Sequence, residues 1–146
     1  MMLSTGNPHM DAQRAFDKAT RAQRRAALLN RIRRQCSECA RLRVHDTLHR
    51  SAPSHTSGVK EIPLEQISAT VEPTRARQFD ADFRPSGKRT RARWERLWVA
   101  EQRGEIIPPI SVVRTHSGYA VVDGHHRVSV AKSRGAVSID AVVSAA

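Results

Sequence analysis

Hydrophobic and polar positions divide the chain into a helical segment, a short polar segment and a compact domain. Between Met10 and Arg50 there is no glycine or proline, and alanine, leucine and arginine are frequent, which favours one long helix or two. Within this segment four apolar positions repeat at 3-4-3 spacing and share one helix face: Leu29, Ile32, Cys36 and Cys39. We expect that face to pack on the domain or on a second copy of the chain, which would form a homodimer.

The segments on either side of this helical stretch are polar. Residues 1–9 contain Gly6 and Pro8 and are expected to be disordered. Residues 51–58 read Ser-Ala-Pro-Ser-His-Thr-Ser-Gly, a composition typical of linkers. The predicted organisation is therefore a disordered N-terminus over 1–9, a basic helical extension over 10–50, a linker over 51–58 and one domain over 59–146.

Strand-like and helix-like patterns alternate within the domain. Ser68 to Arg84 is polar and interrupted by prolines, so it is expected to be mostly loop, and Ser86 is expected to cap a helix that ends at Gly104. The predicted strands are Val59–Pro63, Ile110–Arg114, Tyr119–Val122 and Val137–Val143, and the predicted helices are 86–103, with Trp94, Leu97 and Trp98 on its buried face, and 125–134. This order predicts an α+β fold, a small mixed sheet with packed helices.

The junction between a strand and a helix at Asp123–Arg127, which reads Asp-Gly-His-His-Arg, is the strongest chemical signal in the chain. The first N–H groups of a helix have no partner within it, and the positive end of the helix dipole favours anions there. This turn is therefore a candidate phosphate site. Gly124 would let the backbone approach a ligand, Arg127 would form a bidentate contact, and His125 and His126 would add donors. Asp123 could cap the helix or approach a metal. A capped helix with a solvated basic turn is the alternative.

Three stretches resemble the ParB/sulfiredoxin superfamily, and in particular the N-terminal nucleotide-binding domain of ParB-type partition proteins. They are the Pro-Pro-Ile-x-Val strand within Gly104–Val113, the strand and turn of Tyr119–Arg127, and the closing strand Ile139–Val143. Glu61–Ile67 is a weaker fourth match. The resemblance covers about Val59 to Val143 and implies a sulfiredoxin-like fold and a nucleotide such as CTP, ATP or ADP, with Mg²⁺, at the Asp123–Arg127 turn.

The turn departs from both well-known branches of that superfamily. Sulfiredoxins have a catalytic cysteine where this chain has His125, so the resemblance does not imply cysteine-sulfinate reduction. ParB proteins have Gly-Glu-Arg-Arg, of which Gly124 and Arg127 are matched, so selectivity for CTP is not implied. The Asp-Gly-His-His-Arg form is more similar to the superfamily's free-serine kinases and to a broad set of bacterial ParB-like proteins.

The resemblance also indicates carboxylates that could serve an enzyme. Glu72 precedes Pro73 in the loop where the kinases of the superfamily have a catalytic glutamate, and it could act as a general base toward a hydroxyl group. Glu105, just before Pro108-Pro109, is the second candidate. Either could instead be a solvated surface charge.

Net charge adds a second candidate partner. The chain has 25 Lys+Arg against 14 Asp+Glu, a formal charge of +11, and 12 basic against 4 acidic side chains lie in residues 1–60. Such an excess favours a polyanion, and DNA is the expected one. The candidate contacts lie in the extension: Arg24, Arg25, Arg31, Arg33 and Arg34. No segment has the roughly 20 apolar residues of a membrane span, and Met1–Met10 is no signal peptide, so we expect a cytoplasmic protein without a membrane partner.

Cys36 and Cys39 form a Cys-x-x-Cys with His45 and His49 downstream. A zinc site needs four converging ligands, and six helical residues would turn His45 away from the cysteines. The favoured interpretation is that Cys36 and Cys39 are small apolar residues on a packing face of the helix. Two function hypotheses follow: a stand-alone, DNA-associated nucleotide-binding protein, partition-like or regulatory, or a kinase of a small hydroxyl compound that uses Glu72 or Glu105. An ATPase or nuclease activity is a weaker third.

Overall fold

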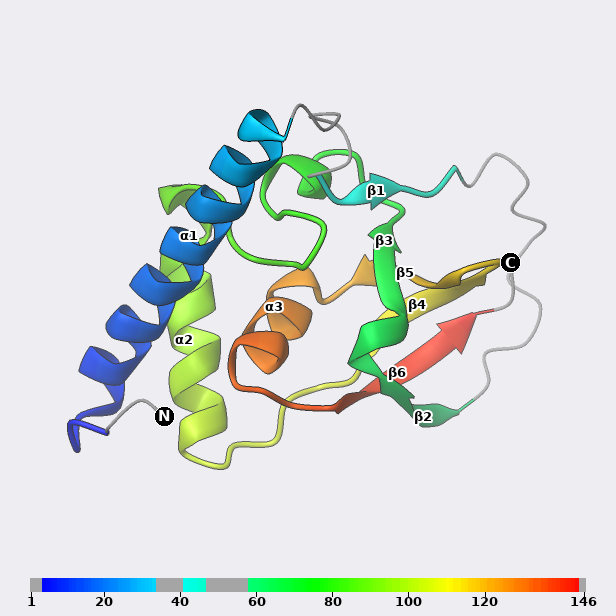
Figure 1. Ribbon diagram of the computed structural model, residues 1–146. Helices are drawn as coiled ribbons and strands as arrows, with labels where there is room; N and C mark the ends of the chain where they lie inside the picture. The colour runs from blue at the N-terminus through cyan, green and yellow to red at the C-terminus, as the bar shows by residue number, and fades with distance from the viewer. Residues whose placement is uncertain (1–3, 34–40, 47–57, 145–146) are drawn as a thin grey trace.

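The computed structural model describes residues 4–33, 41–46 and 58–144, which form a mixed six-stranded sheet with three α-helices beside it (Figure 1). The strand order is β1-β3-β5-β4-β6-β2, with parallel and antiparallel neighbours in one sheet. The predicted α+β class is confirmed. The elements are α1 (Pro8–Ile32), β1 (Arg43–Val44), β2 (Val59–Pro63), β3 (Ile67–Thr70), α2 (Arg91–Gln102), β4 (Ile110–Thr115), β5 (Gly118–Asp123), α3 (His125–Ser133) and β6 (Ser138–Ser144).

Helix α1 begins earlier than expected, because residues 4–7 provide its cap. The side chain of Asn7 accepts a hydrogen bond from the backbone N–H of His9, and Pro8 occupies the first turn, where a missing N–H has no consequence. The Asp11 carboxylate accepts two more bonds from the backbone N–H and hydroxyl of Thr5, at 2.9 and 2.8 Å. The prediction that residues 1–9 are disordered is therefore wrong for residues 4–9.

The expectation of one long helix or two over residues 10–50 is wrong for residues 41–46, because α1 ends at Ile32 and residues 41–46 are not helical. Residues 34–40 and 47–50 lie outside the described residues. Arg43 and Val44 form β1, which pairs in parallel with Ala69 and Thr70 of β3 at the edge of the sheet. Leu42 is only 2% exposed and belongs to the main core. Burial of Leu42 and pairing with a distant strand outweigh the local helix propensity, so residues 41–46 belong to the domain.

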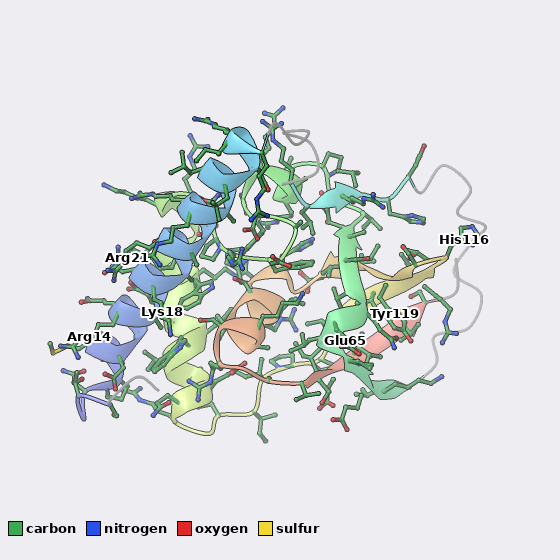
Figure 2. The ribbon with its side chains drawn as sticks, in the orientation of Figure 1. Arg14, Lys18, Arg21, Glu65, His116 and Tyr119 are labelled. Atoms are coloured by element: carbon green, nitrogen blue, oxygen red, sulfur yellow. The ribbon has the colours of Figure 1, made fainter. Side chains whose placement is uncertain are left out.

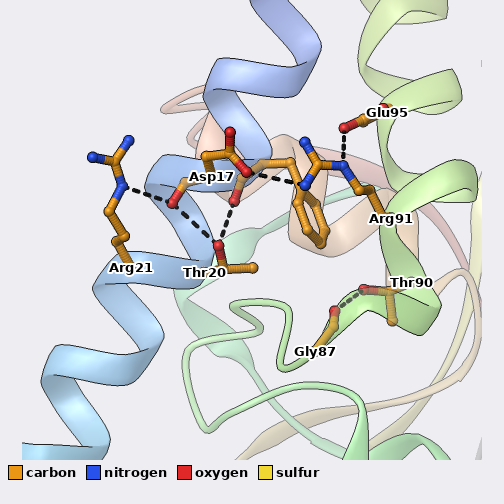
Figure 3. Close-up of polar contacts among 8 residues, drawn as sticks. Asp17, Thr20, Arg21, Gly87, Thr90, Arg91 and Glu95 are labelled. Atoms are coloured by element: carbon orange, nitrogen blue, oxygen red, sulfur yellow. Dashed lines mark hydrogen bonds and ion pairs between the residues drawn. The ribbon is translucent and has the colours of Figure 1, made fainter.

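Three helices lie on one side of the sheet in Figure 1, and α1 packs along α2. Phe16 of α1 meets Trp94 of α2 edge-on, with ring centroids 5.5 Å apart. Trp94 is fully buried, and its indole N–H donates to Ser129 Oγ of α3 at 2.8 Å, which confirms the core role predicted for it. Ion pairs add to this contact, since Arg91 pairs with both Asp17 of α1 and Glu95 of α2 (Figure 3). The basic helix therefore packs on the domain through a second apolar cluster, which contains Phe16, Trp94 and Val130 and is separate from the core of the sheet.

Two further boundaries differ from the predicted ones. The stretch expected to be loop contains β3, whose parallel partner β5 lies about fifty residues away in the chain and is not visible to local patterning. Helix α2 begins at Arg91 rather than after Ser86, because Gly87, at φ +91°, and the short 3₁₀ helix η4 (Lys88–Thr90) precede it. Ser86 Oγ donates to the carbonyl of Arg77 instead of capping a helix.

Candidate anion-binding site at the start of α3

The turn between β5 and α3 is built around Gly124. Its φ of +104° lies in the left-handed region, and a Cβ at this position would come within 2.5 Å of Ile110 Cγ2 on β4. Glycine is therefore required by the backbone conformation and by the neighbouring strand. This tight turn places the first residues of α3 directly after the sheet.

The N-terminus of α3 presents free donors. Its first intrahelical bond joins the Val128 N–H to the Gly124 carbonyl. Across the described ranges, the backbone N–H groups of His125, His126 and Arg127 have no acceptor within the protein. No side chain caps this end of the helix either. Three N–H groups and the positive end of the helix dipole thus remain available to an anion.

His125 is held inside the protein by β3. Its ring is 4% exposed, and Nε2 lies 2.6 Å from Oγ1 of Thr70, which is fully buried at the end of β3. The same hydroxyl oxygen accepts the backbone N–H of Glu72 at 2.9 Å. The ring also stacks on Phe79, with centroids 6.4 Å apart. These contacts fix the orientation of the imidazole and connect it to the loop that follows β3.

His126 is almost as buried, at 7% exposed, and meets Phe79 edge-on at 5.3 Å. In the part of the chain that the structure describes, its ring has no hydrogen-bond partner. Burial, and then the nearby charges of Arg93 and Arg75, lower the pKa of His126 to about 4. Burial, then Arg75, likewise lowers the pKa of His125 to about 4. Both rings are therefore neutral at pH 7, and each has one N–H donor.

Arg127, expected to bind phosphate as a fork, is already engaged. Its Nη1 donates to the carbonyls of Pro108 and Pro109, each at 2.7 Å, and its Nη2 pairs with Asp123 at 2.8 Å. Only 13% of the side chain is exposed. Arg127 therefore ties α3 to the segment that enters β4. Asp123 pairs with this arginine and does not cap the helix.

Two other arginines lie close enough to the turn for their charges to act on its histidines, and both were missed in the sequence. Arg75 comes from the 3₁₀ helix η3 (Arg75–Arg77), where its Nη1 donates to Gln78 Oε1 at 2.8 Å, and Arg93 comes from the first turn of α2. Their charges act on the two histidine rings, which places them near the start of α3. No local pattern could identify them, because they reach this point from separate elements.

The two candidate carboxylates differ in position. Glu72 is joined to the site through its backbone bond to Thr70, and its side chain is exposed. Glu105 follows α2, and its N–H donates to the Ala100 carbonyl. It lines a hollow between α1 and α2, away from the residues of the turn. The structure thus brings Glu72, but not Glu105, to the start of α3.

The candidate DNA contacts lie on or just after α1. Arg24, Arg25, Arg31 and Arg33 are exposed, whereas Arg34, Cys36, Cys39 and His49 lie outside the described residues. In the described ranges no group of three or more His, Cys, Asp or Glu side chains is arranged to hold a metal ion. No helix there is both long and apolar enough to span a membrane.

Comparison with known proteins provides one structural similarity. A sulfiredoxin from Arabidopsis thaliana is similar to this chain, with a TM-score of 0.44 and 21% sequence identity over 60% of this chain and 84% of that protein. No family model matches the chain, and no curated protein matches it. The function must therefore be inferred from the residues of this chain.

Proposed function

We propose that this protein binds the phosphate groups of a nucleotide at the N-terminus of α3. The observation that carries the proposal is the combination of three unpaired backbone N–H groups at the start of α3 with the adjacent His126 ring, which has no hydrogen-bond partner among the described residues. Unpaired N–H groups at the positive end of a helix dipole favour an anion, so this helix start points to a phosphate ligand. The resemblance of Asp123–Arg127 to superfamily nucleotide sites supports the same interpretation.

Each group at this site has a defined part in the proposal. The N–H groups of His125 and His126 would bind phosphate oxygens, and the N–H of the neutral His126 ring would add a donor. Arg75 and Arg93 would neutralise the phosphate charge in place of Arg127, which holds Pro108 and Pro109. Mg²⁺ would arrive on the nucleotide, since Asp123 is occupied by Arg127 and the described residues offer no metal cluster.

Calorimetry with CTP, ATP and ADP in the presence of Mg²⁺ tests this proposal. Arg93→Gln should weaken binding roughly tenfold or more, since one charge-assisted bond contributes about 1.5–3 kcal/mol. Arg96→Gln is the matched control, because Arg96 is exposed on the same helix and does not act on the histidines. Equal affinities of the two variants, or no binding of any nucleotide by the wild type, would remove the proposal.

A kinase is the second candidate, favoured by the link from Glu72 through Thr70 to His125. In this version a small hydroxyl compound accepts the terminal phosphoryl group, and the Glu72 carboxylate takes the hydroxyl proton. Glu72→Gln should then abolish product formation and leave nucleotide affinity nearly unchanged. Nucleotide binding with no product from any hydroxyl acceptor would leave the binding protein as the function.

The basic surface supports an association with DNA as the second part of the proposal. Several exposed cations of α1 and of residues 73–89 are available, and nucleic-acid affinity of this kind falls steeply with salt. A partition-like or regulatory role, a cytoplasmic location and dimerisation through α1 stay predictions. The exposed Leu28, Leu29 and Ile32 near the end of α1 are the surface on which a dimer would depend.

A further inference from the structure

Two hollows adjoin on the surface between α1 and residues 73–89. The first, of about 580 Å³, lies between α1 and the segment that follows η3, and the second, of about 670 Å³, lies between η3 and η4. Both have Arg77 and Ser86 in their walls, so the two hollows are neighbours, and together they are called the Arg77 groove. Its cationic side chains are Arg31, Arg41, Arg77, Lys88 and Arg89.

The cations of the Arg77 groove have no acidic partner among the residues that the structure describes. None of the five has an ion pair or a side-chain hydrogen bond within the described residues. The ion pairs within the described residues are formed by other arginines, namely Arg84, Arg91, Arg127 and Arg134. Unpaired cations in a concave surface concentrate positive potential there, because the low-dielectric walls focus the electric field.

One acid does lie in the groove wall, and its charge is directed inward. The Asp80 carboxylate is 8% exposed and accepts the backbone N–H groups of Asp82 and Arg84, at 3.0 and 2.8 Å. Arg84 also pairs with it through Nη1. Asp80 therefore shapes the loop and offsets little of the positive charge that faces solvent.

The shape and the remaining side chains indicate what would occupy the groove. Gln23 and Asn30 lie seven residues apart on one face of α1 and offer neutral donors beside Arg31. Repeated cations with interspersed neutral donors suit a chain of phosphodiesters. Phe79 in the floor is only 1% exposed, so base stacking is not offered and contact would be with the backbone.

We propose that the Arg77 groove binds single-stranded nucleic acid through its phosphodiester backbone. The inference rests on the DNA-association part of the proposed function and names the surface and the form of the nucleic acid. One strand can follow a depression walled on one side by a helix, whereas a rigid duplex can touch only its rim. Because the contacts are to phosphates, binding should be independent of sequence and strongly dependent on salt.

The test compares two charge-matched variants by fluorescence anisotropy with labelled oligothymidine, over a range of salt concentrations. Arg41→Gln/Arg77→Gln/Arg89→Gln removes three groove cations. Arg14→Gln/Lys18→Gln/Arg21→Gln removes three cations of α1 that do not line the groove and that are labelled along the N-terminal part of the helix in Figure 2. The groove variant should bind roughly tenfold more weakly and lower the salt slope by about 2, since each phosphate contact of a single strand contributes about 0.7. The control should retain its slope.

Other outcomes overturn the inference in distinguishable ways. Wild-type binding that survives the groove substitutions overturns the groove alone, as does a duplex that binds as tightly as the single strand. Absence of any binding at low salt overturns both the groove and the proposed DNA association. If the triple variant does not fold, as judged by circular dichroism, Lys88→Gln/Arg89→Gln replaces it, because both residues are exposed. Its salt slope should fall by about 1.4.

Discussion

Acidification should destabilise this protein well above the pH at which carboxylates titrate, because His125 and His126 are buried in the neutral form. Their pKa values are lowered from 6.5 to about 4, chiefly by burial. In the unfolded chain both rings take up protons as the pH falls through 6.5, while the folded protein resists protonation until about pH 4. Stability is therefore fully present above pH 6.5 and is lost progressively between 6.5 and 4.

The magnitude follows from the two pKa values. A difference of 2.5 between folded and unfolded pKa corresponds to about 3 kcal/mol for each ring, at about 1.4 kcal/mol per pKa unit. The two rings repel each other when both are charged, so the second proton is taken up at lower pH. Between pH 7 and pH 4.5 the free energy of unfolding should fall by roughly 3–6 kcal/mol, a large part of the stability of a small domain.

Urea denaturation at pH 7.5, 6.0, 5.0 and 4.5 measures this effect, with tryptophan fluorescence as the probe because Trp94 is buried in the core. His126→Gln should lose part of the pH dependence even if the variant is less stable at pH 7.5. His116→Gln is the control, since His116 lies at the exposed tip of the hairpin of β4 and β5 (Figure 2). If wild type and His126→Gln lose the same free energy between pH 7.5 and 4.5, the interpretation of a buried neutral imidazole is wrong.

Two further predictions concern the turn itself. Gly124→Ala should lower the free energy of unfolding by about 2–4 kcal/mol, because it adds both left-handed strain and a clash with Ile110; a midpoint shift no larger than that of Gly58→Ala, an exposed control, would contradict this. Arg127→Lys should cost about 2 kcal/mol, since an ammonium cannot hold both the Pro108 and Pro109 carbonyls and Asp123 in the same planar arrangement. Urea unfolding of Arg127→Lys measures this loss, with Arg96→Lys as the control. If the two variants have the same free energy of unfolding, the structural role of Arg127 is refuted.

Local sequence patterns were sufficient for the C-terminal half of the domain. The strand of β4, the hairpin, the turn at Gly124 and the start of α3 at His125 lie close to where they are expected. Each depends on contacts between near neighbours: alternation of side chains along a hairpin, and a glycine whose backbone conformation other residues avoid. Candidate donors at the start of α3 follow from the geometry of any helix terminus.

Elements that depend on distant partners were not visible to the same reasoning. β1 forms where a helix is expected because Val44 pairs with Thr70 and Leu42 enters the core, and both interactions join residues far apart in the chain. β3 was missed for the same reason, because its strand character depends on β5. Secondary structure that exists through tertiary pairing leaves only a weak local signal.

The sequence by itself determined the class of the fold, the position of the turn and the presence of excess positive charge. Only the tertiary structure decided which cations serve which purpose. It assigns Arg127 to the Pro108 and Pro109 carbonyls and brings the charges of Arg75 and Arg93 near the histidines. Within the described ranges it leaves the cations of the Arg77 groove without an ion pair. A side chain's charge is a property of the residue, but whether that charge is paired, buried or free depends on groups that folding brings from elsewhere in the chain.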